Sequence, residues 1–390
     1  MRMNRWAILA GYGLLAASTQ LLWLTYSPIT NQAHQVMGVS EAEVGNLALI
    51  FPLLYVLLAL PFGRWLDVRF ARALGTGAAL TGGGGLLRLI APSSFTCALI
   101  GQFVIAAGQP LVLNSITKVA ARYFPESERT AAISAGSVSL YLGILLAALS
   151  GEPLYNAGGM RLVLTVQGVI GVAGAAWMLL ALRSPAAYPG DAAVGVSLRW
   201  LRRDRFMWVL AGMLFAGMGI FNAVATWLQP ILDHFGYGAD AGNLIAVMTI
   251  AGIGGAAVLP EIFAKRDQRR AMLRITVSVG VVAFVAIALA HSVVFTGVAL
   301  AVEGAVLLAA LPVVLDWSES HSGPERAGEA VGFLLLAGNL GGVVLVIAVQ
   351  AVIASAYASL GVMAAVSLLA LALSARLPAQ AARPDRADRR

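Results

Sequence analysis

The chain has 390 residues, of which 59% are hydrophobic and 12% are charged, and its mean hydropathy is +0.83. Soluble domains carry about 25% charged residues, so these few charges cannot cover that much apolar surface in water. A soluble globule is therefore excluded, and a polytopic membrane protein is indicated. The single Cys97 excludes an internal disulfide framework. The four histidines show no metal-binding spacing, so we expect no metal, no cofactor and no catalytic group.

Apolar runs of about 20 residues, each long enough to cross a bilayer, predict an all-α membrane protein. The first run follows MRMNR and could pass for a signal peptide, but because many further runs follow, we interpret it as an uncleaved span. In chain order the twelve predicted spans are 6–33, 41–62, 73–91, 96–118, 130–150, 160–182, 206–232, 240–262, 272–290, 293–315, 327–350 and 353–375.

The twelve spans divide into two halves that resemble each other. YSPI (26–29) corresponds to LQPI (228–231), GRWLDVRFAR (63–72) to PEIFAKRDQRR (260–270), and FPESERTAA (124–132) to SGPERAGEA (322–330). Three matches in one register indicate a duplicated six-helix unit. The predicted organisation is a six-helix bundle over 1–183, a cytoplasmic linker over 184–205, a second bundle over 206–377 and a basic disordered tail over 378–390.

The basic residues predict the orientation of the chain in the membrane. With a cytoplasmic N-terminus, all 26 Lys and Arg residues except Arg88 and Arg161 fall on the cytoplasmic side. The net charge of +7 therefore reflects the orientation of the chain in the membrane and does not indicate nucleic-acid binding. We expect a plasma or bacterial inner membrane location, cytoplasmic termini, and a monomer whose partners are the bilayer and a small-molecule substrate.

Polar residues are concentrated in the first span, where QLLWLTYSPITN covers 20–31. On a helix, Gln20, Trp23, Ser27 and Asn31 share one face, which suits a water-filled cavity. Span seven repeats the pattern with Asn222, Thr226, Gln229 and Asp233, and places Pro230 where span one has Pro28. Since duplicated transporters bind substrate between their halves, both stretches are interpreted as parts of one binding site.

Other interpretations of these residues remain open. Tyr26 and Trp227 fit an interfacial aromatic belt as well as a cavity wall. Gln20 and Asn222, and on span four Gln102 and Gln109, fit either helix-to-helix hydrogen bonding or cavity lining. The glycines of span three (Gly75, Gly77 and 82–85) indicate close helix packing, since no P-loop context surrounds them.

Two ionisable residues lie inside the predicted spans. Glu303 is central in span ten, where a carboxyl group is costly and therefore marks a candidate proton or cation coupling site. The alternative is a neutral glutamic acid bonded to a neighbouring helix. Arg88 lies near the outer end of span three, so we expect its side chain to reach the interface as an anchor. The alternative is that it pairs with the substrate or with a carboxylate.

The twelve spans and the loop motifs resemble the major facilitator superfamily. Its signature after span two matches Gly63, Asp67, Arg69 and Arg72, while Val68, Phe70 and Ala71 depart from it. The resemblance implies a cytoplasmic gate, to which the mirrored loop contributes Glu261, Lys265, Arg269 and Arg270.

A narrower resemblance joins WLTYSPITN, LRLIAPSSFTCALIGQFVIAAGQP (87–110), RYFPESE (122–128) and 222–255 to the feline leukaemia virus subgroup C receptor-related (FLVCR) transporters, associated with choline and haem. It implies a cation-binding tryptophan at Trp23, a second aromatic position at Asn222, which is not aromatic here, and an amide at Asn339. No residue matches the family's span-five glutamine.

The predicted function is secondary active transport of a small organic solute, an organic cation or an amphiphile, by alternating access. A proton-coupled multidrug exporter using Glu303 is the alternative within transport. A membrane-embedded enzyme or a receptor is the alternative outside it, and neither a catalytic constellation nor a signalling domain is evident.

Overall fold

The computed structural model describes residues 3–188, 200–266, 268–322 and 326–378, and the predicted linker and tail lie largely outside them. Helices are the regular secondary structure of the described residues, and ten of these helices are long and apolar enough to cross a membrane. Two of these, α3 (Glu41–Leu87) and α6 (Glu126–Ala181), are long enough to cross twice and are broken inside. The predicted all-α fold with twelve spans is therefore confirmed.

Two compact units make up the structure. Unit 1 contains residues 1–194, 223–249 and 350–356, and unit 2 contains 195–222, 250–349 and 357–390. The C-terminal part of α7 (Arg205–Asp233) and the start of α8 (Ala241–Lys265) thus belong to unit 1. The remaining helices of unit 2 are α9 (Arg269–Ala290), α10 (Val293–Ser322), α11 (Ala327–Gln350) and α12 (Ala356–Ser374), and α9 packs against α10.

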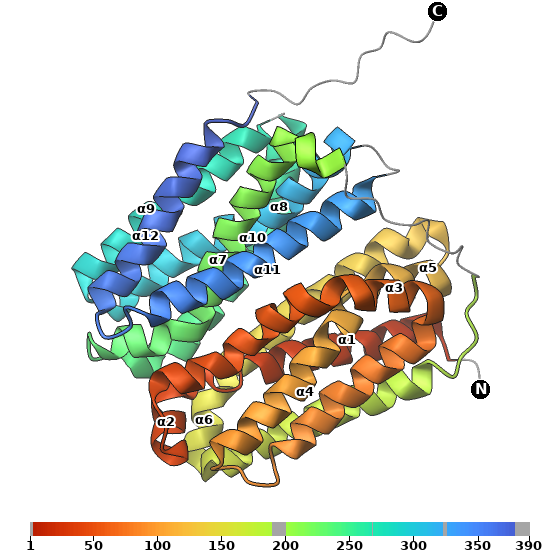
Figure 1. Ribbon diagram of the computed structural model, residues 1–390, viewed down its shortest axis with the longest axis horizontal. Helices are drawn as coiled ribbons and strands as arrows, with labels where there is room; N and C mark the ends of the chain where they lie inside the picture. Colours follow the sequence, from red (N-terminus) through yellow and green to blue (C-terminus); the bar gives the residue numbers. More distant parts are fainter. Residues whose placement is uncertain (1–2, 189–199, 267, 323–325, 379–390) are drawn as a thin grey trace, which may run out of the picture. The chain divides into compact units, whose positions relative to one another are not determined.

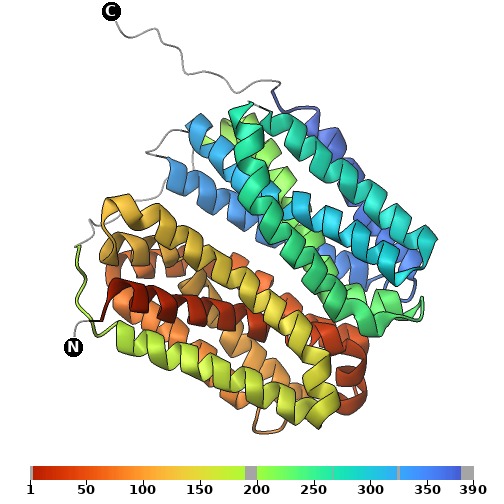
Figure 2. The same ribbon diagram turned by 180° about the vertical axis from the view of Figure 1, so that it is seen from behind.

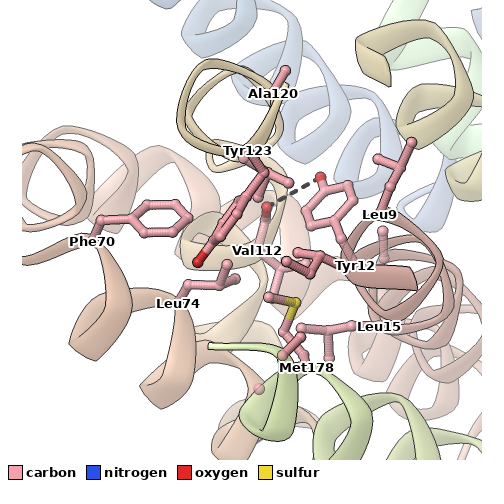
Figure 3. Packing of buried hydrophobic residues seen from close by; sticks show 14 of the residues in the cluster. Leu9, Tyr12, Leu15, Phe70, Leu74, Val112, Ala120, Tyr123 and Met178 are labelled. Atoms are coloured by element: carbon pink, nitrogen blue, oxygen red, sulfur yellow. Dashed lines mark hydrogen bonds between the residues drawn. The ribbon is translucent and has the colours of Figure 1, made fainter. Parts of the chain in front are cut away.

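Unit 1 is built around α1 (Arg5–Trp23), which is buried along most of its length. Figure 2 shows α1 between the two arms of α6, and α3 packs against α4 (Phe95–Leu113) on the other side (Figure 1). Side chains from α1, α3, α4 and α5 (Ile116–Tyr123) fill the core, where the Tyr12 hydroxyl donates to the Val112 carbonyl over 3.3 Å (Figure 3).

Glycines allow α3 and α4 to approach closely, as predicted for span three. A Cβ atom on Gly84 would lie 2.8 Å from the Gly101 carbonyl oxygen, and one on Gly77 would lie 3.1 Å from the Gly108 oxygen. Both distances are too short for a methyl group against backbone. The glycine run is therefore a packing surface between two helices.

Three predicted boundaries are wrong. The first span is not one helix over 6–33, because α1 ends at Trp23, a short 3₁₀ turn covers Ser27–Ile29, and α2 (Thr30–Met37) follows. The expected loop 63–72 is helical except at Arg69, where φ is −138° and ψ is 56°. The fourth span also breaks, between Leu113 and Ile116.

Candidate functional site

Polar residues from the two predicted stretches meet at one end of unit 1. The Asn31 backbone N–H on α2 donates to Gln229 Oε1 on α7 over 3.1 Å, and Asn31 Nδ2 donates to the Asp233 carboxylate. Gln229 Nε2 in turn donates to Gln32 Oε1 over 3.2 Å. The structure therefore brings the segment that follows YSPI together with LQPI and the residues after it.

Carboxyl groups surround this network. Asp233 lies within electrostatic range of Glu41 at the start of α3, and Glu152 on α6 lies within range of both Asp233 and Asp240. All four residues belong to unit 1. Neighbouring charges of one sign raise the local concentration of counter-ions. This end of unit 1 therefore attracts cations and repels anions.

Trp23 has a partner for its indole nitrogen. Nε1 donates to the Ala48 carbonyl oxygen on α3 over 3.0 Å, and the ring lies beside Phe51 with centroids 6.4 Å apart. The Ala48 carbonyl has no regular helical donor, because the residue four positions later is Pro52, which lacks an N–H. The tryptophan therefore satisfies a backbone group that the proline leaves without its partner.

The end of α1 is also held by side chains from two other segments. Arg88 Nη1 donates to the Leu22 carbonyl over 3.4 Å and to Thr25 Oγ1 over 2.9 Å, and Gln102 Nε2 donates to the Trp23 carbonyl over 3.4 Å. Irregular backbone at membrane depth is tolerated where protein groups satisfy it. This explains why the helix can end inside the bundle, five residues before Pro28.

The expectation that Arg88 reaches the interface as an anchor is wrong, because its side chain is 0% exposed. The helical wheel of the sequence analysis also fails beyond Trp23, since Ser27 lies in a 3₁₀ turn and Asn31 in a separate helix. The aromatic-belt interpretation of Tyr26 and Trp227 is wrong as well, because both are buried.

The other predicted binding residues of unit 1 are buried among its helices. Gln102 bonds to neighbouring helices, as the helix-bonding interpretation expected. The remainder of the set, Gln20, Ser27, Gln109 and Thr226, are each at most 6% exposed. Their part in substrate binding stays a prediction.

In unit 2, two predicted amide residues come close together. A Cβ atom on Gly342 of α11 would lie 3.1 Å from Asn222 Nδ2 of α7, and Asn339 is one turn before Gly342. Each amide donates to the carbonyl of its own helix four residues earlier, Asn222 to Met218 over 2.7 Å and Asn339 to Leu335 over 2.9 Å. Their carbonyl oxygens therefore remain the groups that could accept from a substrate.

Glu303 lies between helices of unit 2. It is 1% exposed, and a Cβ atom on Gly280 of α9 would lie 3.2 Å from its Oε1 and 2.8 Å from Ser367 Oγ of α12. Its Oε2 has no hydrogen-bond partner among the described residues. The carboxyl group thus faces α9 and α12 across a space that the glycine leaves.

The predicted gate residues form ion pairs within each unit. Asp67 on α3 pairs with Lys118 on α5, and Arg269 Nε on α9 lies 2.8 Å from Asp316 Oδ2 on α10. Arg69 marks the break in α3. The remaining predicted gate residues, Gly63, Arg72 and Glu261, lie on α3 and α8 at the same predicted cytoplasmic ends.

Sequence reasoning missed several partners. Lys118 and Asp316 were not connected to the gate, although each lies at the end of a predicted span, opposite in charge to the signature residue. Thr25 and Gln167 were not singled out, yet Thr25 Oγ1 donates to Gln167 Oε1 over 2.6 Å, deep in unit 1. Polar residues in apolar spans were the available signal, but it does not specify which of them meet.

Comparison with known proteins places this chain among membrane transporters. The model of the Major Facilitator Superfamily matches residues 8–346. Solved structures of a bacterial homolog to the human lysosomal transporter Spinster share the fold: the inward-facing, unoccupied form has a TM-score of 0.74 at 18% identity and covers 96% of this chain and 97% of that one.

Similar sequences extend the comparison. Solute carrier family 49 member A3 of Danio rerio is 31% identical over 66% of this chain and 58% of its own length, and that of Xenopus tropicalis is 25% identical over 89% and 77%. The choline/ethanolamine transporter FLVCR2 of Rattus norvegicus is 23% identical over 65% of this chain and 52% of its own length. The chain thus spans less than two thirds of the first and third relatives, and the resemblance to FLVCR transporters is confirmed.

Proposed function

This chain belongs to the Major Facilitator Superfamily, and from that premise we propose that it carries a small organic cation or amphiphile across the membrane by alternating access. The family points to a multi-pass membrane transporter rather than an enzyme. The observation that carries the choice of a cation is the group of carboxylates around the Asn31–Asp233 network in unit 1. A relative whose name states choline and ethanolamine supports the same choice.

The proposed ligands of the cation are an aromatic ring and neutral amide or hydroxyl oxygens. Trp23 supplies the ring, and an indole face attracts a desolvated ammonium by about 2 kcal/mol, roughly a thirtyfold effect on affinity. Unit 1 offers the amide and hydroxyl groups of Gln20, Ser27, Gln109, Thr226 and Gln229, and unit 2 offers those of Asn222 and Asn339. Asn222 stands where the FLVCR resemblance places a second aromatic, so Asn222→Tyr should strengthen the binding of quaternary amines.

Uptake into proteoliposomes tests the proposal. Radiolabelled choline and ethanolamine should enter, an excess of either should compete, and an organic anion of equal size should not. Trp23→Ala should weaken uptake strongly and Trp23→Phe less, because phenylalanine keeps a ring. The matched control is Trp6→Ala, since Trp6 is 46% exposed at the opposite end of α1. Transport of the anion in preference to the cations would overturn the proposal.

A second candidate, proton-coupled export, is favoured by the buried carboxyl group of Glu303. Its unpartnered Oε2 can hold a proton without breaking another hydrogen bond. In that mechanism the exchange of a proton at Glu303 between α9 and α12 accompanies the movement of substrate. Accumulation driven by an imposed pH gradient, lost in Glu303→Gln, distinguishes it from uniport.

We further propose that both termini face the cytoplasm of a plasma or bacterial inner membrane, as the basic residues predict. Labelling of single cysteines in a Cys97→Ser background tests this orientation. A cysteine replacing Gln35, exposed beside the outer network, should react in intact cells. One replacing Val68, which is 79% exposed beside the break in α3, should react only after permeabilisation. The reverse pattern would invert the topology.

A further inference from the structure

The guanidinium group of Arg88 is buried without a counter-ion. Its side chain is 0% exposed at the end of α3, and no carboxylate among the described residues pairs with it. Leaving an ion buried without compensation costs several kcal/mol. The negative ends of helices α1 and α3 offset part of this cost, because the Leu22 carbonyl and the last turn of α3 lie beside the charge.

Hydrogen bonds are made on only one side of the guanidinium group. Nη1 donates to the Leu22 carbonyl, to Thr25 Oγ1 and to Gln102 Oε1, the last over 3.2 Å. Nε and Nη2 are buried and make no well-aligned hydrogen bond with any residue that the structure describes. These two nitrogens form the parallel fork with which arginine binds carboxylates and other anions. No carboxylate among the described residues therefore occupies the anion-binding edge.

The polar side chains around Arg88 have hydrogen-bond donors that are not fully used. Gln167 accepts from Thr25 through Oε1, while its Nε2 is buried without a partner. The Tyr26 ring has its centroid 5.9 Å from Arg88 Cζ, and its buried hydroxyl group lies next to the guanidinium group without a well-aligned hydrogen bond to any described residue. A positive charge, an amide N–H and a phenol O–H have in common that they bind a negative species.

We propose that unit 1 holds a small monovalent anion of about the size of chloride between the Arg88 fork, Tyr26 and Gln167. Because Arg88 and Thr25 also secure the end of α1 next to Trp23, the anion stabilises the segment that carries the proposed cation-binding ring. The site is independent of which substrate is transported.

Thermal unfolding of the purified full chain in detergent tests the anion site. Sodium chloride and sodium bromide are titrated against sodium gluconate at constant ionic strength. We expect a saturable rise in Tm of about 3 °C with either halide and none with gluconate. Arg88→Lys keeps the charge but removes the fork, and should abolish the halide effect. Arg161→Lys, at an exposed arginine, is the matched control and should retain it.

A second variant and a direct measurement keep the proposal falsifiable if Arg88→Lys does not fold. Tyr26→Phe preserves the packed ring, removes one donor and should raise the halide concentration needed for half of the effect severalfold. Crystals grown in bromide should show an anomalous peak beside Arg88 Nε and Nη2. Equal stabilisation by gluconate, an unchanged halide effect in Tyr26→Phe, or density for water alone would overturn the proposal.

Discussion

The hydrogen bond between Trp23 and the Ala48 carbonyl predicts a specific rescue. In Trp23→Phe the indole donor is lost, and the buried Ala48 oxygen has neither the side-chain donor nor a helical N–H, because position 52 is proline. An unsatisfied buried carbonyl costs about 1–3 kcal/mol. For a cooperative unit of this size, a loss of about 2 kcal/mol lowers Tm by roughly 4–8 °C.

Pro52→Ala supplies the missing donor, since an alanine N–H at this position can bond to the Ala48 carbonyl four residues earlier. The double variant Trp23→Phe/Pro52→Ala should therefore recover most of the stability that Trp23→Phe loses. Thermal unfolding of the wild type, both single variants and the double variant gives the coupling energy, which we expect to be about 1–2 kcal/mol. Additive effects would refute the reasoning and return the tryptophan to a role in substrate binding alone.

The same variants distinguish the structural role of Trp23 from its role in substrate binding. If Trp23 also binds a cation through its ring, Trp23→Phe/Pro52→Ala should be as stable as the wild type and still transport choline with reduced affinity, because a benzene ring attracts cations less than an indole. Uptake measured on this stable background is free of the folding defect. Wild-type affinity in the double variant would show that the indole acts only through its hydrogen bond.

Three further predictions address the remaining features. Glu303→Gln should abolish uptake driven by a pH gradient while leaving counterflow exchange intact, which proteoliposome assays distinguish; loss of both would assign the residue to folding. Gly84→Ala should lower Tm by several degrees because its methyl group meets backbone, whereas Gly83→Ala, with nothing within 4 Å, should not; equal effects would contradict the packing argument. Reversing either charge of the Asp67–Lys118 pair should slow transport and lower the free energy of unfolding by about 1 kcal/mol or less. Reversing both charges should restore transport; if it does not, another partner of these residues matters more.

The fold could be predicted from the sequence because hydropathy and repetition act over the whole chain. A helix of about 20 apolar residues is stable in the bilayer whichever helices lie beside it. The number of spans therefore follows from the distribution of apolar residues along the chain. Breaks inside the spans could not be predicted in the same way. The end of α1 at Trp23 depends on Arg88 and Gln102, more than 60 residues away, which satisfy its last carbonyls.

At the candidate site, the sequence repeat pointed to one pair of residues that the structure brings into contact. The repeat relates Asn31 to Asp233, and the structure joins them by a hydrogen bond. Arg88 shows the limit of the approach, because snorkelling was inferred from its position in the span, while its burial depends on Thr25 and Gln102. Three-dimensional partners decide the role of such a residue, and a single sequence does not contain them.

The two halves of the duplication carry opposite charges at corresponding contacts. At the predicted cytoplasmic ends, unit 1 pairs an acid on α3 with a base on α5, whereas unit 2 pairs the base Arg269 on α9 with the acid Asp316 on α10. An ion pair needs only opposite signs, so its polarity can reverse during divergence without loss of the contact.

The same reversal occurs inside the bundles. In unit 1 the buried Arg88 on α3 occupies the space left by Gly101 on α4, and in unit 2 the buried Glu303 on α10 occupies the space left by Gly280 on α9. A glycine facing a long side chain is thus common to both halves, while the charge and the helix that carries it differ. In each unit, therefore, an ionisable side chain is buried where a glycine on a neighbouring helix leaves room for it, and the sign of its charge differs between the two units.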